Sequence, residues 1–201
     1  MLEPRPYQHE ALRAVLKRWQ DGVTRQLVSL PTGCGKTIIF GMVAEAARAR
    51  TLVLAHREEL LLQACQKIQM VYPEVDIGIL KAEERRGLDA DICVASVQTA
   101  IRHIPELEAR GYRLLICDEA HHAISPSYMS LFDGLGFLAS DTGKLLLGVT
   151  ATAYRGDNAG LGEVFQEIVF ERSILAMMKA GYLCASLFSD TLLHVVASSD
   201  V

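Results

Sequence analysis

Short apolar runs alternate along this chain with longer segments whose apolar residues recur at helical spacing. Between residues 7 and 19 this spacing gathers one helical face, made of Ala11, Leu12, Val15, Leu16 and Trp19. Further helices are predicted over residues 36–50 and about 58–70. The short apolar runs predict strands over residues 26–30, 51–55, 76–80, 92–95, 114–117 and 145–149. Surface loops are expected over residues 133–143 and 155–162.

Several of the predicted strands are apolar throughout and do not alternate with polar residues. A parallel sheet covered by helices on both faces requires such strands, because both sides of each strand are buried. Strand–helix–strand repetition at this spacing implies right-handed crossovers. The predicted fold class is therefore α/β, with three layers and a mostly parallel central sheet. At about 150 residues per domain, a chain of 201 residues is expected to form one domain.

Composition narrows the class of protein. Half of the residues are hydrophobic and 22% are charged, which excludes disordered and collagen-like chains. The net charge of −4 gives no overall basic field, so a nucleic-acid partner would need a local patch. Neither a signal-peptide core nor an apolar run of about 18 residues is found, so we expect a cytoplasmic protein without a membrane partner. The cysteines are widely spaced and without a C-x-x-C pair, and they predict reduced thiols: Cys34, Cys65, Cys93, Cys117 and Cys184.

A glycine-rich turn follows the first predicted strand and precedes a predicted helix. Its residues are Pro31, Thr32, Gly33, Cys34, Gly35, Lys36 and Thr37. Glycines let successive N–H groups point at phosphate oxygens, and the helix presents its positive end to the same anion. Lys36 would then reach the β- and γ-phosphates, and the Thr37 hydroxyl would bind Mg²⁺. The alternative is an ordinary turn with a solvated lysine, and Leu30 stands where the strict phosphate-loop pattern has glycine.

Two adjacent carboxylates follow the predicted strand over residues 114–117. Asp118 and Glu119 would be costly at a buried strand end unless a cation faced them. The ends of parallel strands meet at one edge of the sheet, beside the glycine-rich turn. Asp118 suits Mg²⁺, and Glu119 suits deprotonation of an attacking water. A solvated acidic loop is the alternative.

These motifs resemble the first RecA-like lobe of superfamily 2 helicases and translocases, specifically the DEAH/DExH branch. Asp118-Glu119-Ala120-His121 follows Pro31-Thr32-Gly33-Cys34-Gly35-Lys36-Thr37 in the family order. Arg5-Pro6-Tyr7-Gln8 resembles the adenine-recognising motif, and the segment 55–60 resembles motif Ia. The segments 95–100 and 148–152 resemble the next strand-contacting motif and motif III. The resemblance covers residues 5–183, and short motifs of this kind are specific only jointly.

The resemblance implies roles that residue chemistry leaves open. Gln8 would read the adenine edge, with Tyr7 or Arg5 beside the base. His121 would relay the γ-phosphate state to Thr150 and Thr152. These residues could equally be a solvated helix residue, a core histidine and strand-end hydroxyls.

Nucleic acid is the partner that the resemblance implies, with DNA favoured over RNA. Its candidate contacts are Arg57, Gln98 and Thr99, whose side chains suit backbone phosphates and do not read bases. For Arg57 the alternative is a surface ion pair with Glu58 or Glu59.

The family builds its ATPase from two RecA-like lobes, with arginine fingers supplied by the second. We expect residues 1–183 to form lobe 1 and residues 184–201 a tail or the start of a linker. The second lobe would come from the same longer chain or from another chain. With ATP and Mg²⁺ as cofactors, the lobe would bind nucleotide and hydrolyse it poorly alone. A stand-alone nucleotide-dependent nucleic-acid binder is the alternative function; a small-molecule kinase would not explain residues 118–121 followed by 150–152.

Overall fold

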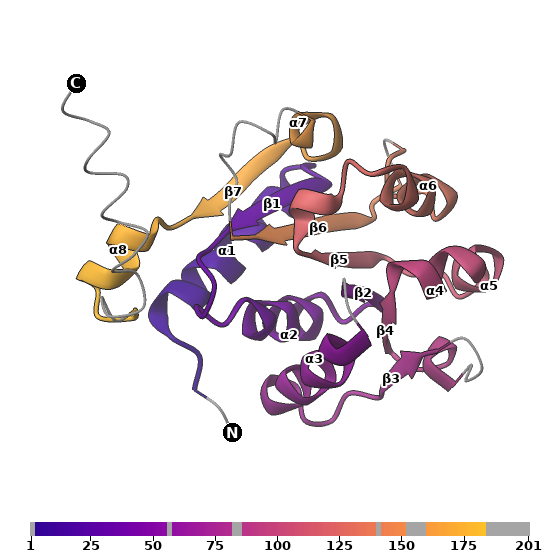
Figure 1. Cartoon of the computed structure of the whole chain (residues 1–201), viewed down its shortest axis with the longest axis horizontal. Coiled ribbons are helices and arrows are strands. Elements are labelled where there is room, and N and C mark those ends of the chain that lie inside the picture. Colours follow the sequence, from indigo (N-terminus) through magenta and orange to yellow (C-terminus); the bar gives the residue numbers. More distant parts are fainter. Residues whose placement is uncertain (1–2, 56–57, 82–85, 140–141, 152–159, 184–201) are drawn as a thin grey trace.

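A twisted parallel sheet forms the centre of the molecule (Figure 1). The computed structural model describes residues 3–55, 58–81, 86–139, 142–151 and 160–183. Within these residues the strands are β1 (Arg25–Ser29), β2 (Thr51–Ala55), β3 (Ile77–Leu80), β4 (Ile92–Ser96), β5 (Leu114–Asp118), β6 (Leu145–Thr150) and β7 (Glu167–Glu171). Their order is β3-β4-β2-β5-β6-β1-β7, and each pair of neighbours is parallel.

Helices connect the strands and cover the sheet (Figure 1). They are α1 (Pro6–Gln20), α2 (Lys36–Ala47), α3 (Glu58–Val71), α4 (Val97–Arg102), α5 (Ile104–Ala109), α6 (Pro126–Gly134), α7 (Leu161–Val164) and α8 (Ile174–Lys179). Two short 3₁₀ helices are also described, η1 (Arg86–Leu88) and η2 (Ala120–His122).

The core lies in two layers, one on each face of the sheet. Ile116 of β5 packs in the layer that holds the apolar faces of α1, α2 and α3. Its neighbour Leu115 points to the opposite layer, with α4, α5, α6 and α7. Because successive strand residues face opposite sides, both layers draw on every central strand. The three-layer α/β arrangement predicted from the apolar strands is confirmed.

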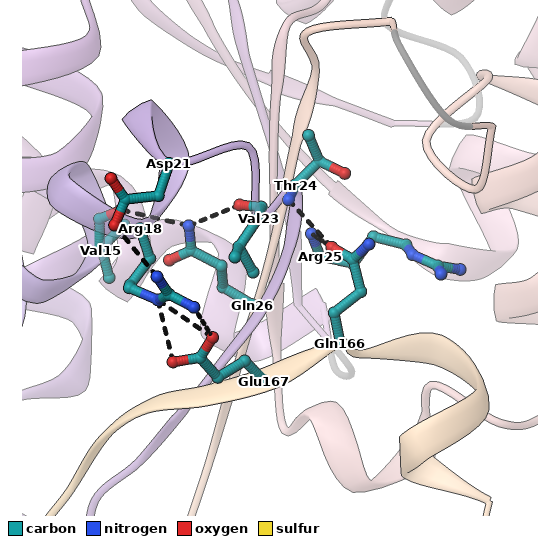
Figure 2. Close-up of polar contacts among 9 residues, drawn as sticks. All are labelled: Val15, Arg18, Asp21, Val23, Thr24, Arg25, Gln26, Gln166 and Glu167. Carbon is teal, nitrogen blue, oxygen red and sulfur yellow. Dashed lines mark hydrogen bonds and ion pairs between the residues drawn. The ribbon is translucent and has the colours of Figure 1, made fainter.

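The edge strand β7 was not predicted, because its sequence carries a glutamate at each end and its residues are mostly half-buried. Polar side chains at the start of β7, those of Gln166 just before the strand and of Glu167 in it, contact α1 and the start of β1 (Figure 2). The Gln166 side-chain oxygen accepts the N–H groups of Thr24 and Arg25, both at 3.0 Å. The Arg18 guanidinium donates to both carboxylate oxygens of Glu167. The position of β7 in the sheet therefore depends in part on side-chain contacts between residues that are more than 140 positions apart in the sequence.

The predicted loop over residues 133–143 is wrong in its first half. Helix α6 continues to Gly134, and the side chains of Leu135 and Phe137 are buried in the core. Residues 155–159 of the other predicted loop lie outside the described residues, and α7 begins at Leu161 within its predicted range. No helix in the described part of the chain is long and apolar enough to cross a membrane.

Because strands β1 to β7 are all parallel, their carboxyl ends meet at one edge of the sheet. The glycine-rich turn follows β1 there, and Asp118 ends β5. Strand β6 separates β1 from β5 and ends at Thr150. This edge therefore gathers most of the residues that the sequence singles out.

Candidate nucleotide-binding site

The glycine-rich turn between β1 and α2 depends on two left-handed residues. Gly33 has φ +84° and Gly35 has φ +67°, conformations that residues with a Cβ seldom adopt. A Cβ at Gly35 would also stand 2.8 Å from the Gln8 side-chain nitrogen. Leu30 is fully buried, and its N–H donates to the Thr150 carbonyl at 2.9 Å. The leucine that departs from the strict phosphate-loop pattern thus belongs to the core, and the turn begins after it.

Lys36 begins α2 and points its ammonium at Glu119. The Nζ atom lies 3.6 Å from Glu119 Oε1, and the lysine side chain is 10% exposed. The Nζ atom is buried and lacks a hydrogen-bond partner among the described residues. A buried ammonium carries three donors and is costly to leave unsatisfied. The site therefore fits an anionic acceptor such as a phosphate oxygen.

The two carboxylates after β5 occupy a strained turn. Glu119 has φ +49°, a left-handed conformation that is uncommon for residues other than glycine. Its N–H donates to Asp118 Oδ1 at 3.0 Å, and its Oε2 lies 3.4 Å from His121 Nδ1. This conformation places the Glu119 carboxylate between Lys36 and His121. Backbone strain of this kind concentrates at functional sites.

Burial raises the pKa of Asp118 above its ordinary value, and the neighbouring Glu119 charge raises it further. The Glu119 N–H, Lys36 and Lys67 act in the opposite direction. An added cation would favour the charged carboxylate. Asp118 and the half-buried Thr37 hydroxyl are hard oxygen donors of the kind that Mg²⁺ prefers. Among the described residues no cluster of three or more His, Cys, Asp or Glu side chains could hold a metal alone.

The N-terminal segment is tied directly to the glycine-rich turn. The Tyr7 hydroxyl donates to the Cys34 carbonyl at 2.6 Å. The Gln8 side-chain nitrogen lies 3.4 Å from the same oxygen and 3.3 Å from the Gly35 carbonyl. Gln8 also accepts the Arg5 N–H at 2.8 Å, which closes the first turn of α1. Gln8 therefore holds the turn in place in addition to the base-reading role that the sequence suggests for it.

A cavity of about 280 Å³ lies beside this junction. Its walls are Glu3, Arg5, Tyr7, Gln8, Gly33, Cys34, Gly35, Ile38, Lys67 and Met70. Lys67 and Met70 come from α3 and were missed in the sequence. Their spacing of three puts them on one helical face, but only the packing of α3 against α2 shows which site that face borders.

Of the residues expected to relay the γ-phosphate state, His121, Thr150 and Thr152, the two that the structure describes do not share one environment. His121 lies in η2, which packs against β6, and contacts Glu119. Thr150 is fully buried at the end of β6, where its carbonyl accepts the Leu30 N–H. Thr152 lies outside the described residues.

The candidate nucleic-acid contacts are only partly at the surface. Gln98 is exposed in the first turn of α4. Thr99 is buried, its N–H donates to Ser96 Oγ at 3.2 Å, and its hydroxyl lies 3.0 Å from the same oxygen. Ser96 thus caps α4, Thr99 is the third residue of the helix, and the buried Thr99 side chain is not placed where a nucleic acid could contact it. Arg57 lies outside the described residues.

Comparison with known proteins assigns the family. The family profile described as "Type III restriction enzyme, res subunit" matches residues 1–155. The chain belongs to this family of superfamily 2 helicases and translocases. Within superfamily 2 it is an N-terminal RecA-like lobe, as the resemblance in sequence predicted.

The chain is similar to two named motor proteins. It is 34% identical over 197 residues to the Saccharomyces cerevisiae protein named "Putative ATP-dependent helicase IRC3", a match that covers 92% of this chain and 29% of the relative. It is 31% identical over 179 residues to the "DNA 3'-5' translocase XPB2" of Sulfurisphaera tokodaii, covering 86% of this chain and 36% of the relative. The chain thus spans about a third of the length of these relatives.

Solved structures share the fold. The Hef helicase domain of Pyrococcus furiosus matches with a TM-score of 0.65 and 25% identity, over 85% of this chain and 38% of that chain. The SWI2/SNF2 ATPase core of Sulfolobus solfataricus, solved in complex with dsDNA, matches with a TM-score of 0.63 and 19% identity. That match covers 79% of this chain and 34% of the other chain.

Proposed function

We propose that this superfamily 2 lobe binds Mg²⁺–ATP and forms the first half of an ATP-driven motor that moves on or unwinds nucleic acid. The observation that carries the proposal is the buried Lys36 ammonium, unsatisfied beside a left-handed glycine turn and 3.6 Å from Glu119. A phosphate chain would satisfy the ammonium and the N–H groups of the turn together. The ion pair with Glu119 leaves the hydrogen-bond donors of the Lys36 ammonium free for such an anion.

Each site residue has a role in this proposal. Lys36 holds the β- and γ-phosphates, and Thr37 and Asp118 hold Mg²⁺, which neutralises phosphate charge when bound. Glu119 accepts the proton of the attacking water. Arg5, Tyr7 and Gln8 border the cavity that would take the adenine base. His121 and Thr150, with Thr152, would pass the state of the γ-phosphate to the rest of the motor.

The proposed motor also requires a nucleic acid and a second lobe. The named relatives are a helicase and a DNA translocase, which supports a nucleic-acid partner and favours DNA. Their greater length supports a second RecA-like lobe, from the same longer chain or supplied in trans. An arginine finger from a partner increases kcat by a factor of about 10³–10⁵ in related phosphate chemistry. This lobe alone should therefore hydrolyse ATP poorly. Gln98 and Arg57 are the proposed backbone contacts on this lobe.

Paired substitutions of Lys36 and Glu119 test the proposal. Lys36→Ala should abolish binding of a fluorescent ATP analogue without unfolding the lobe, because Lys36 contributes a charge and little core packing. Lys81→Ala, an exposed lysine after the edge strand β3, is the matched control and should bind as the wild type does. Glu119→Gln should bind Mg²⁺–ATP and stop turnover in the two-lobe protein, since the amide cannot accept a proton at neutral pH. Unchanged binding in a folded Lys36→Ala variant would refute the nucleotide site.

A further inference from the structure

The last described residues of the chain return to the nucleotide-binding end of the lobe. Helix α8 ends in a Schellman motif, in which the Tyr182 N–H donates to the Met177 carbonyl at 2.9 Å and the Gly181 N–H donates to the Met178 carbonyl at 3.0 Å. Gly181 has φ +74°, as this reversal requires. The described residues after α8 therefore turn back from the helix in a defined direction.

This reversal places Tyr182 on the N-terminal segment. Its ring lies edge-on to the ring of Tyr7, with a centroid distance of 4.8 Å and an angle of 65°. The Arg5 guanidinium carbon lies over the Tyr182 ring, 5.4 Å from its centroid. Both values are within the range of attractive aromatic and cation–π contacts. Tyr182 thus contacts two residues from the opposite end of the described chain.

The next residue extends the contact to the glycine-rich turn. Leu183 lies against Gly33, with its Cδ2 atom 3.7 Å from where a Cβ at residue 33 would stand. Arg5, Tyr7 and Gly33 all line the 280 Å³ cavity, whereas Tyr182 is not among its lining residues. Tyr182 therefore supports the cavity wall from behind and does not reach into the cavity.

We infer that Tyr182 is a positioning residue for the nucleobase, acting through Arg5 and Tyr7. This inference rests on the proposed function, because it assumes that the cavity takes the base of a nucleotide. A long arginine side chain at an exposed position loses considerable rotamer freedom when it binds a ligand. The Tyr182 ring holds the guanidinium over its face before the ligand arrives, which lowers that entropic cost. Tyr182 also braces Tyr7, whose hydroxyl holds the Cys34 carbonyl of the turn.

The support given by Tyr182 should affect recognition of the base and leave recognition of the phosphate chain unchanged. The proposed phosphate ligands are the turn N–H groups and Lys36, which does not line the cavity, whereas Tyr182 contacts Arg5 and Tyr7. Tyr182→Ala is therefore expected to weaken ATP binding by about 3- to 10-fold, the range of a single cation–π contact. Binding of inorganic tripolyphosphate should stay within twofold of the wild type.

Binding titrations of the folded chain with ATP and with inorganic tripolyphosphate test the inference. Tyr182→Phe keeps the ring and should restore the wild-type ATP affinity. Tyr72→Ala is the matched control, because Tyr72 is another half-buried tyrosine on the same core layer and does not line the 280 Å³ cavity. Tyr72→Ala should lower the melting temperature without changing the ratio of ATP to tripolyphosphate affinity.

The outcomes separate this inference from the proposed function. A selective loss of ATP affinity in Tyr182→Ala, restored by Phe, supports the positioning role. Unchanged ATP affinity, or an equal loss for ATP and tripolyphosphate, shows that Tyr182 only packs and overturns the inference. If the wild type binds neither ligand, or if Lys36→Ala binds both as well as the wild type does, the proposed function itself fails.

Discussion

Buried polar atoms without a hydrogen-bond partner are unusual in folded proteins, and most of those among the described residues lie around the turn at Glu119. Among the described residues they are Gln26 Oε1, Lys36 Nζ, His121 Nδ1 and Tyr128 Oη. Lys36 and His121 flank Glu119 directly. Tyr128 lies behind the same turn, with its ring 6.4 Å from that of His122. Burial raises the pKa of Tyr128, and the nearby Cys117, Asp118 and Glu119 raise it further. The site thus retains unsatisfied groups that a core selected for stability alone would lack.

Replacing Tyr128 with phenylalanine should stabilise the lobe. The substitution removes the unpartnered hydroxyl and keeps the ring that packs on Phe132. An unsatisfied buried polar group costs about 1–3 kcal/mol, which corresponds to roughly 2–4 °C per kcal/mol in melting temperature for a domain of this size. Thermal unfolding of Tyr128→Phe beside Tyr112→Phe tests this, since the Tyr112 hydroxyl has the Leu88 carbonyl as a partner at 3.5 Å. A lower melting temperature for Tyr128→Phe would mean that the hydroxyl has a favourable partner.

The raised pKa of Asp118 makes a second prediction, on pH dependence. Because the folded state holds the Asp118 proton more tightly than the unfolded state does, stability falls as the pH rises from the ordinary aspartate value through the raised one. Asp118→Asn has no charge to desolvate, so without Mg²⁺ it should melt at a higher temperature than the wild type at pH 7. The difference should shrink toward pH 4. Thermal melts across this range check it, with the exposed Asp133→Asn as control; a pH-independent difference would exclude the ionisation as its cause.

At the scale of the element, the glycine-rich turn before α2 depends on the left-handed backbone conformation of Gly33 and Gly35. Gly35→Ala should destabilise the lobe and abolish binding of an ATP analogue. The left-handed conformation costs about 1–2 kcal/mol for a residue with a Cβ, and Gln8 would have to give up its contacts with the turn. Gly111→Ala is the matched control, since Gly111 has the same φ of +67° with open space around it. Gly111→Ala should show the strain cost alone and bind nucleotide normally; equal binding by both variants would argue against the phosphate-loop assignment.

The sequence predicts strands best where both faces of the strand are buried. Strands β1, β2, β4, β5 and β6 are almost fully buried, and their predicted ranges agree with the structure to within about a residue at each end, as does that of the half-buried edge strand β3. Strand β7 lies at the other edge, is held by Gln166 and Glu167, and has an apolar run of only three residues, 168–170. Thr99 shows the same limit at a single residue, because its hydroxyl can face solvent or pair with the N-cap Ser96 of α4, and only the fold decides. Lys67, Met70 and Tyr182 belong to the nucleotide end through tertiary packing, which no spacing in the sequence encodes.

At the scale of the whole molecule, the candidate nucleotide site lies at one end of a parallel sheet, and the chain carries a net charge of −4. The charge supplies no long-range attraction for nucleic acid. The proposed contacts with nucleic acid must then be few and local. They are confined to one lobe, which would form only one side of a groove between two lobes. Gln98 is neutral and Arg57 is cationic, which allows their contributions to be separated.

Binding of the lone lobe to single-stranded DNA should therefore be weak, salt-sensitive and almost independent of sequence. Each phosphate neutralised by a cation contributes about −0.7 to the slope of log K against log salt concentration, so a slope of about −1 to −3 is expected. Arg57→Ala should reduce the magnitude of that slope by about 0.7, the share of one phosphate. Gln98→Ala should weaken binding and leave the slope unchanged, because a neutral amide releases no counterion. A salt series with two labelled oligonucleotides of unrelated sequence measures both effects. A strong preference for one oligonucleotide, or a slope that Arg57→Ala does not change, would place the nucleic-acid track on another surface of the lobe.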